Sequence, residues 1–291
     1  MEHGLNFKSL ENQEAYAACY DRSLKLLDIE VIEQFIETEY GSTHILISKN
    51  RTKPPLVLLH AASCTSCIWF QNLSCWSSSF CIYAVDLIGE SSKSILKKKL
   101  KTPYDNACWI KQTLDGLKLT SIYLCGLSIG GWTAANFAAY YPDMVMKLIL
   151  MSPVQTFAKM HTSYFFRIMK MGFHPTRENV EQYIGWGSAK EAPLPDSIIE
   201  QFTLSVMNMN SNASFPKWLN KGQLQKLNMP VYVLFGSQEF AFSIGKAVKR
   251  AERYVHNLKL EIIENASHLL CVSKPSDVNQ RVVDFLLDEA D

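Results

Sequence analysis

A serine flanked by two glycines is the first feature of this sequence that could do chemistry. Residues 126–130 read GLSIG, preceded by the apolar segment 122–125 and followed by the mostly small residues GWTAA at 131–135. This Gly-x-Ser-x-Gly pattern is typical of a sharp turn from a strand into a helix, which exposes the serine hydroxyl. Side chains two positions before and after the serine would collide in that turn, so glycine is needed at both. Ser128 is therefore the predicted nucleophile.

A serine hydroxyl is a poor nucleophile until a base takes its proton. In a turn of this kind, the base follows the last strand of the sheet, and an acid follows the strand before it. Of the seven histidines, His268 fits that place, because it comes shortly after the strand predicted at 259–265. The others lie near the N-terminus, at the end of an early strand, or on segments expected to be helical.

The imidazole in turn needs a carboxylate that fixes its tautomer and stabilises its charged form. Glu239 is the one acid at the end of the strand predicted at 231–236. The alternative place for such an acid is 153–155, after the strand predicted at 147–152, but it reads PVQ and offers no carboxylate. We therefore expect Glu239 to be the partner of His268.

The negative charge that develops on the substrate oxygen must meet preorganised hydrogen-bond donors. The backbone N–H of the residue after the nucleophile, Ile129, is one such donor. A second should come from the loop that follows the early strand predicted at 56–60, and we assign it to the N–H of Ala62.

The overall composition is that of an ordinary globular chain with almost no net charge. The 29 Lys and Arg nearly balance the 28 Asp and Glu, so no field is available to attract nucleic acid or an anionic membrane. The one basic run, at 97–101, indicates a solvated loop. The N-terminal residues lack the apolar core of a secretory signal, and no segment approaches the roughly 20 apolar residues of a membrane span. We expect a cytoplasmic protein with no nucleic-acid or membrane partner.

Eight cysteines raise the question of disulfides, redox chemistry or metal binding. Disulfide scaffolds are usually short and secreted, and this chain is neither by the criteria above. Cys64 and Cys67 have the spacing of a redox pair or of half a zinc site. They lie in a loop rich in serine and cysteine, however, and no second Cys-x-x-Cys would complete four ligands. We expect reduced, structural cysteines and neither a metal nor a cofactor.

The elements that must position these residues alternate along the chain. Short apolar runs rich in β-branched residues predict strands at 32–39, 44–48, 56–60, 81–86, 122–126, 147–152, 231–236 and 259–265. Helical patterns occupy 10–26, 104–117, 130–141, 244–255 and 276–289. The first two strands should form an antiparallel pair around Gly41. The alternation after them predicts an α/β fold, with a mostly parallel central sheet and helices on both of its faces.

One long segment breaks this alternation. Residues from about 153 to 227 show several helical patterns and no convincing strand, and the segment is too long for a simple loop. We predict a core of 1–152 and 228–291 and a helical cap, or lid, of 153–227 inserted after the sixth strand. Some of the large apolar side chains of this cap should face the nucleophile: Phe157, Tyr164, Phe165, Phe166, Met169, Met171, Tyr183, Trp186, Phe202, Met207, Met209, Phe215 and Trp218.

Several segments around these residues resemble successive landmarks of the α/β-hydrolase superfamily. They are LVLLHAAS at 56–63, YAVDLIGESSKS at 83–94, CGLSIGGWTAANFAAYYPDMV at 125–145, VYVLFGSQE at 231–239 and NASHLL at 265–270. The resemblance covers about 43–289, and the layout is similar to single-domain bacterial carboxylesterases of about this length. It implies an α/β-hydrolase fold, a catalytic triad in the chain order Ser128, Glu239, His268, and esterase-like activity.

Two positions depart from the usual pattern of the superfamily. Most members have Asp where this chain has Glu239, although some of the bacterial carboxylesterases also use Glu. The loop that supplies the second donor commonly begins His-Gly, whereas here Ala61 follows the histidine, and its methyl group would strain a backbone that needs positive φ. The resemblance gives Asp86 and Gly89 a structural role in the turn after a central strand.

Together these observations predict a serine hydrolase that cleaves small to medium apolar acyl esters through an acyl-enzyme intermediate. A thioesterase, a lactonase or an acyltransferase would use the same triad, and a slow-turnover ligand sensor on a hydrolase scaffold would keep it. Fast turnover of p-nitrophenyl butyrate would favour the enzyme, and cap rearrangement without turnover would favour the sensor. The expected partner is a small-molecule acyl substrate, and the expected state is a monomer or a homodimer.

Overall fold

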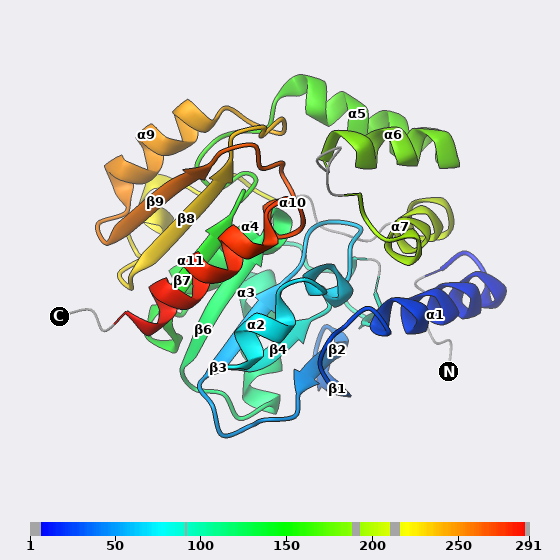
Figure 1. Cartoon of the computed structure of the whole chain (residues 1–291), viewed down its shortest axis with the longest axis horizontal. Helices are drawn as coiled ribbons and strands as arrows, with labels where there is room; N and C mark the ends of the chain where they lie inside the picture. The colour runs from blue at the N-terminus through cyan, green and yellow to red at the C-terminus, as the bar shows by residue number, and fades with distance from the viewer. Residues whose placement is uncertain (1–6, 91, 188–192, 210–215, 289–291) are drawn as a thin grey trace.

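A nine-stranded sheet lies at the centre of the protein. The computed structural model describes residues 7–90, 92–187, 193–209 and 216–288. Within these residues the strands follow the order β1-β2-β4-β3-β6-β7-β8-β9, and β5 pairs with β2 (Figure 1). Their bounds are β1 Val31–Thr38, β2 Gly41–Ser48, β3 Pro55–Leu59, β4 Cys81–Val85, β5 Ile95–Leu96, β6 Ile122–Leu127, β7 Val145–Met151, β8 Val231–Gly236 and β9 Leu258–Ile263.

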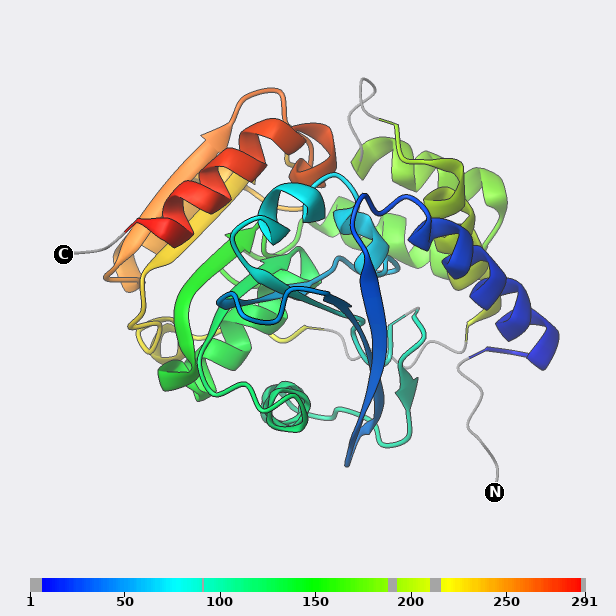
Figure 2. The same ribbon diagram turned by 60° about the horizontal axis from the view of Figure 1, so that its bottom comes forward.

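The direction of the strands brings one set of strand ends together. β1, β2 and β5 are antiparallel to their neighbours, whereas all pairs from β4 to β9 along the sheet are parallel. The sheet is strongly twisted, so that β1 in blue and β9 in orange are turned steeply against each other in Figure 2. The carboxyl ends of the parallel strands share one edge, which is where ligands bind in open α/β sheets.

Helices cover both faces of the sheet, as the apolar strands require. On one face Trp109 and Phe137 belong to a buried cluster with strand residues. On the other face Trp76 and Val282 belong to a second cluster. The first face is covered by α3 (Pro103–Gly116), α4 (Ile129–Tyr140) and α9 (Ile244–Tyr254), and the second by α2 (Leu73–Ser77) and α11 (Pro275–Leu287).

The segment between β7 and β8 consists of helices joined by loops, and its described residues contain no strand of the sheet. In Figure 1 its first three helices lie beyond the carboxyl edge of the sheet, at the upper right. The helices are α5 (Thr162–Phe173), α6 (Arg177–Gly187), α7 (Asp196–Asn208) and α8 (Lys221–Leu224). The division of the chain into a core and a cap stays a prediction.

The N-terminal helix α1 (Leu10–Leu24) packs along α7 (Figure 1). Arg22 forms an ion pair with Glu200 at 2.6 Å, and the N–H of Lys8 donates to the carbonyl of Asn208 at 2.8 Å. The other side of α1 buries Tyr20 against the loop near the start of η1 (Ser66–Trp69). The helix therefore joins η1 to the helical segment.

The predicted fold class is confirmed, and the predicted long elements agree with the structure to within a few residues at their ends. The two-residue strand β5 was not expected, so the helical segment follows the seventh strand in chain order, not the sixth. The short helices η1, α2 and α10 (Leu270–Ser273) were also missed, because they are too short to show a helical period.

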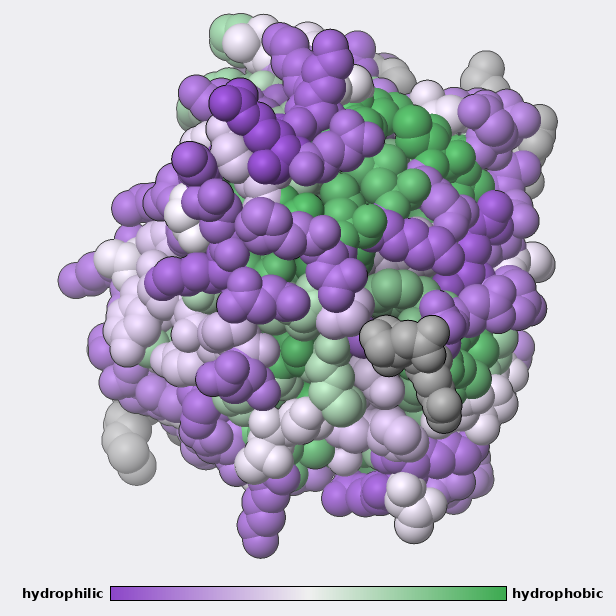
Figure 3. Space-filling model, turned by 90° about the vertical axis from the view of Figure 1, so that its left-hand side faces the viewer, coloured by the Kyte–Doolittle hydropathy of each residue, from purple (hydrophilic) through white to green (hydrophobic). Residues whose placement is uncertain are grey.

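The side of the molecule where β9 is the edge strand is mostly hydrophilic. Figure 3 shows this side, with a hydrophobic band open between the hydrophilic side chains.

No helix among the described residues is long and apolar enough to cross a membrane. The expected monomer or homodimer stays a prediction.

We expect Leu124→Ala to destabilise the protein strongly, because Leu124 is fully buried in β6, the strand that leads to Ser128. The loss in free energy of unfolding should be about 2–5 kcal/mol. Ile262→Ala on the edge strand β9 is the matched control, because Ile262 is 43% exposed and should lose about 1 kcal/mol or less. Urea unfolding at equilibrium measures both, and equal losses would contradict the assignment of the core.

Candidate functional site

Ser128 occupies a strained turn between β6 and α4. Its backbone has φ 56° and ψ −113°, a conformation that non-glycine residues seldom adopt and that often marks a functional site. A Cβ on Gly126 would lie 2.2 Å from the carbonyl oxygen of Gly130, and one on Gly130 would lie 2.1 Å from the carbonyl oxygen of Leu59. Both positions are therefore restricted to glycine, as the sequence pattern predicts, and the turn lies directly against the end of β3.

Three side chains from separate strand ends form a chain of hydrogen bonds at the carboxyl edge. Ser128 follows β6, Glu239 follows β8, and His268 follows β9. The Oγ of Ser128 lies 2.9 Å from Nε2 of His268, and Nδ1 of that imidazole lies 2.7 Å and 2.9 Å from the two carboxylate oxygens of Glu239. The structure thus brings together all three side chains that the sequence singled out.

The charges around the hydrogen-bonded triad favour protonation states that suit proton transfer. Burial raises the pKa of Glu239, but the charge and hydrogen bond of His268 and the N–H of Ala241, 2.8 Å away, outweigh it and lower the pKa overall. An ionised Glu239 requires the proton on Nδ1 of the imidazole. The lone pair of Nε2 is then directed at the hydroxyl of Ser128, which is the arrangement a general base needs.

Two backbone N–H groups near Ser128 are available as donors. Ile129 is the first residue of α4, and the first N–H groups of a helix have no partner within it. Ala62 lines the same pocket as Ser128 and His268. Across the described ranges of the chain, neither N–H donates to any acceptor. Both can therefore receive an oxyanion.

The peptide between Ala61 and Ala62 is held by His60, which sequence reasoning did not assign to the site. Nε2 of His60 accepts the N–H of Leu87 at 2.9 Å, so its proton is on Nδ1, which donates to the carbonyl of Ala61 at 2.8 Å. In a trans peptide the C=O and the next N–H point in opposite directions. This bond therefore turns the N–H of Ala62 away from His60, and burial lowers the pKa of His60 and keeps it neutral.

The far side of the same loop is held by Glu90. Its carboxylate accepts the N–H of Ser63 at 3.1 Å, and Ser63 has φ 56°. The expectation that Ala61 needs positive φ is wrong, because the left-handed residue of this loop is Ser63, two positions later. Ala61 is therefore compatible with the loop. No sequence motif marks Glu90, since its partner lies 27 residues away.

Asp86 and His44 form a buried ion pair beneath this region. Asp86 accepts the N–H of Ser66 and lies 2.9 Å from Nδ1 of His44, whose Nε2 lies 2.9 Å from Glu33. Burial raises the pKa of Asp86, but the hydrogen bond and charge of His44 outweigh it and lower the pKa to about 2. Burial lowers the pKa of His44, and the two carboxylates together raise it above its ordinary value. The imidazolium ties β1 and β2 to the turn after β4, where Gly89 has φ 83°.

A pocket of about 450 Å³, partly open to solvent, adjoins Ser128 and His268. Aromatic side chains from the helical segment form much of its wall: Tyr164, Tyr183 and Phe202. Of the other predicted cap residues, Phe157 is buried in the core and Phe165 and Phe166 are exposed. Phe215 and the side chain of Trp186 lie outside the described residues.

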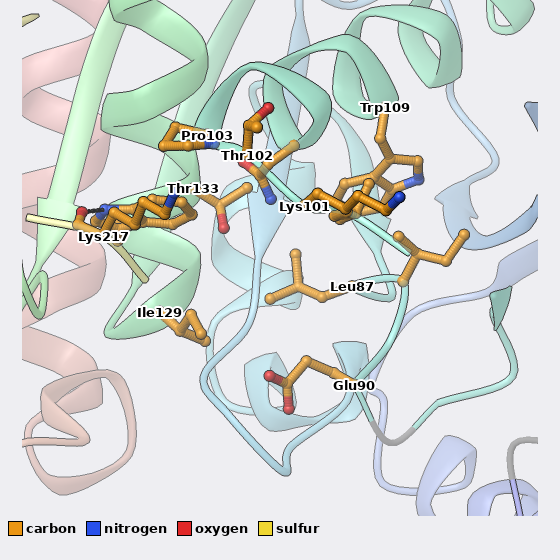
Figure 4. A pocket seen from close by; sticks show the side chains of 13 residues that line it. Leu87, Glu90, Lys101, Thr102, Pro103, Trp109, Ile129, Thr133 and Lys217 are labelled. Atoms are coloured by element: carbon orange, nitrogen blue, oxygen red, sulfur yellow. Dashed lines mark hydrogen bonds between the residues drawn. The ribbon is translucent and has the colours of Figure 1, made fainter. Parts of the chain in front are cut away.

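A second pocket lies on the other side of Ile129 and is drawn in Figure 4. It has about 520 Å³ of space, and Leu87, Glu90 and Trp109 line it together with Lys101 at its rim. Neither Ser128 nor His268 lines this pocket. The pocket beside the hydrogen-bonded triad is therefore the candidate substrate site.

The Cys-x-x-Cys pair takes no part in this site as a disulfide. Cys64 and Cys67 are both buried free thiols, and the other six cysteines are also free. Burial raises the pKa of Cys64 to about 12. A thiol that holds its proton this strongly is a poor nucleophile and metal ligand.

Comparisons with known proteins agree with this geometry. The model of the α/β hydrolase fold matches residues 54–179. Carboxylesterase YbfK of Bacillus subtilis is 32% identical over 293 aligned residues, which cover 98% of this chain and 98% of the relative. Its crystal structure has a TM-score of 0.92 and covers 97% of this chain and 100% of its own. The crystal structure of naproxen esterase from the same organism has a TM-score of 0.90 at 30% identity, covering 96% and 99%.

The chain belongs to the α/β-hydrolase family. Relatives that it resembles over nearly its whole length include two carboxylesterases of Bacillus subtilis, as the sequence landmarks predicted.

We expect the stability supplied by His44 to depend on pH. Its pKa is raised in the folded state, so its ion pairs stabilise the fold fully below the ordinary value of about 6.5 and lose that effect as the pH rises through the raised value. The difference in free energy of unfolding between wild type and His44→Gln should therefore shrink as the pH rises above the ordinary histidine pKa of about 6.5. His256→Gln on the exposed surface is the control. A difference for His44→Gln that does not change with pH would refute the buried imidazolium.

Proposed function

We propose that this protein is a carboxylic ester hydrolase in which Ser128 is the nucleophile, His268 the base and Glu239 the acid. The carrying observation is the continuous hydrogen-bond chain from Oγ of Ser128 to the carboxylate of Glu239, placed beside a pocket. The names of the relatives, carboxylesterases of Bacillus subtilis, support the same reaction.

The proposed reaction proceeds in two halves. Nε2 of His268 takes the proton of Ser128 as Oγ attacks the acyl carbon, and the oxyanion accepts hydrogen bonds from the N–H groups of Ala62 and Ile129. Collapse of this intermediate breaks the bond to the alcohol oxygen, which receives the proton from His268. Water then attacks the acyl-enzyme with His268 again as base, and the acid product leaves. Glu239 stays ionised and stabilises the imidazolium throughout.

The walls of the pocket favour a small to medium apolar acyl ester. Apart from Ser128, His268 and two tyrosines, the residues that line it are apolar, glycine or cysteine. We propose that residues 153–227 act as a cap, because α5, α6 and α7 contribute Tyr164, Tyr183 and Phe202 to this wall. A cap of this kind would exclude water and strengthen the electrostatic interactions within the site.

A panel of substrates distinguishes ester hydrolysis from the other reactions that the same triad could catalyse. Esters, thioesters and lactones of graded chain length would be compared by kcat/KM, with an added alcohol to detect acyl transfer. Binding with cap movement but without turnover would indicate a ligand sensor. The cytoplasmic location stays a prediction.

We expect Ser128→Ala to abolish ester hydrolysis while the fold is retained, because no other hydroxyl in the described chain contacts His268. p-Nitrophenyl butyrate turnover and circular dichroism measure the two properties. Ser267→Ala is the matched control: Ser267 is also buried, next to the base in sequence, but its Oγ has no partner among the described residues. Retained hydrolysis in Ser128→Ala would remove the assignment of the nucleophile.

We expect Glu239→Gln to lower kcat by about 10³- to 10⁴-fold, because an amide cannot hold the required tautomer or stabilise the imidazolium. Glu239→Asp keeps the charge on a shorter side chain and should lose much less. Steady-state kinetics with one ester compare the three proteins. A rate for Glu239→Gln close to that of wild type would place the acid elsewhere.

A further inference from the structure

We propose that the preferred ester carries a second oxygen acceptor, an ether or carbonyl oxygen away from the scissile bond, which accepts a hydrogen bond from the pair Tyr164 and Tyr183. This inference rests on the proposed ester hydrolysis and specifies the class of substrate for that site.

The two tyrosines meet at the wall of the substrate pocket. Tyr164 lies on α5 and Tyr183 on α6, and both line the pocket that holds Ser128. Their hydroxyl oxygens are 2.8 Å apart, so the two hydroxyls share one hydrogen bond. Tyr164 is only 5% exposed, which makes the pair a polar group inside the molecule and not a surface contact.

The two tyrosine hydroxyls carry one more O–H donor than their mutual hydrogen bond uses. Burial raises the pKa of Tyr164 to about 12 and that of Tyr183 well above its ordinary value, so both hydroxyls keep their protons at neutral pH. Two protonated hydroxyls hold two O–H donors, and the bond between them uses one. Neither hydroxyl has another partner in the part of the chain that the structure describes. One O–H group therefore lacks a protein acceptor.

Among the described residues, the rest of the pocket lining offers this donor no acceptor side chain. Besides Ser128, His268 and the two tyrosines, its lining consists of alanine, leucine, isoleucine, phenylalanine, glycine and one cysteine. In the free enzyme, water can satisfy the remaining O–H. A ligand that displaces this water must supply an acceptor, or it leaves a buried donor unpaired.

The rings around the pair fix it in place relative to the reacting groups. Tyr164 packs edge-on against Phe240 with ring centroids 5.3 Å apart, and Tyr183 stacks on Phe202 at 5.8 Å. Phe240 also packs edge-on against His268 at 5.6 Å. Because the pair is tied to the base through one ring, the donor lies at a set distance from the scissile bond. The acceptor oxygen should therefore be favoured at one position of the substrate chain and not at its neighbours.

An oxygen scan of the substrate tests this inference. Straight-chain p-nitrophenyl esters would have one CH₂ replaced by oxygen at successive positions, each compared with its all-carbon parent. Acetates of alcohols with the same replacements cover the other arm of the ester. Values of kcat/KM are divided by the alkaline hydrolysis rate, which removes the inductive effect of the oxygen. We expect about tenfold higher kcat/KM at one position, the size of one satisfied buried hydrogen bond.

Variants of the pair show whether the tyrosines cause the preference. Tyr164→Phe and Tyr183→Phe each leave one hydroxyl with a free proton, so each should keep part of the preference. The double variant Y164F/Y183F has no donor and should treat oxygen and all-carbon esters alike. Tyr254→Phe, on α9 outside the pocket, is the matched control and should keep the full preference. Circular dichroism confirms that each variant folds.

Two results would overturn the inference. One is a wild-type scan in which no oxygen position in either arm gains over its parent, and the other is a gain that survives in the folded double variant. Failure of the proposed function is a separate result, since then neither p-nitrophenyl butyrate nor any member of the series would be hydrolysed in a Ser128-dependent way.

Discussion

The close approach of the turn after β6 to the end of β3 is the constraint on which the rest of the site depends. A Cβ on Gly130 would meet the carbonyl oxygen of Leu59 at 2.1 Å, so the two backbones lie as close as glycine allows. This approach places Ser128 beside the loop of Ala62. It also places the first turn of α4, with its free N–H groups, next to Ser128 and this loop. The proposed nucleophile is thus positioned by backbone packing, the N–H of Ala62 by the side chain of His60, and the proposed base and acid by each other.

Around this backbone contact, three sets of polar groups support the site, and each lies further from Ser128 than the one before. Glu239 holds His268, His60 holds the peptide before Ala62, and the pair of Asp86 and His44 supports the turn behind them. Each set uses charge or burial to fix one protonation state: an ionised acid, a neutral His60 and a charged His44. The pKa values of the two histidines shift in opposite directions. His44 lies between two carboxylates, which raise its pKa, whereas at His60 the effect of burial is larger and lowers the pKa.

The sequence was informative wherever a local rule decides the structure. Steric limits at the turn pointed to Ser128, and the rule that parallel strands end at one edge pointed to His268 and Glu239, which the structure brings into contact. Family membership and the order of the long elements were predictable for the same reason.

Long-range packing decided what the sequence could not show. The bond from Ser63 to Glu90 joins residues 27 apart, and the two carboxylate partners of His44 come from β1 and from the end of β4. The left-handed residue of the donor loop proved to be Ser63 and not Ala61, because the whole loop path, and not one residue type, sets φ. The strand β5 is two residues long, too short for any periodic signal.

The helix α1 packs against α7, which contributes Phe202 to the wall of the pocket. The helix pairs with α7 through Arg22, Lys8 just before it donates its backbone N–H to the end of α7, and the opposite side of the helix is buried near η1. Any motion that lifts α7 must therefore either break these contacts or take the first helix along with it. A displacement of α7, whose Phe202 lines the pocket, is therefore coupled to residues more than a hundred positions before Ser128.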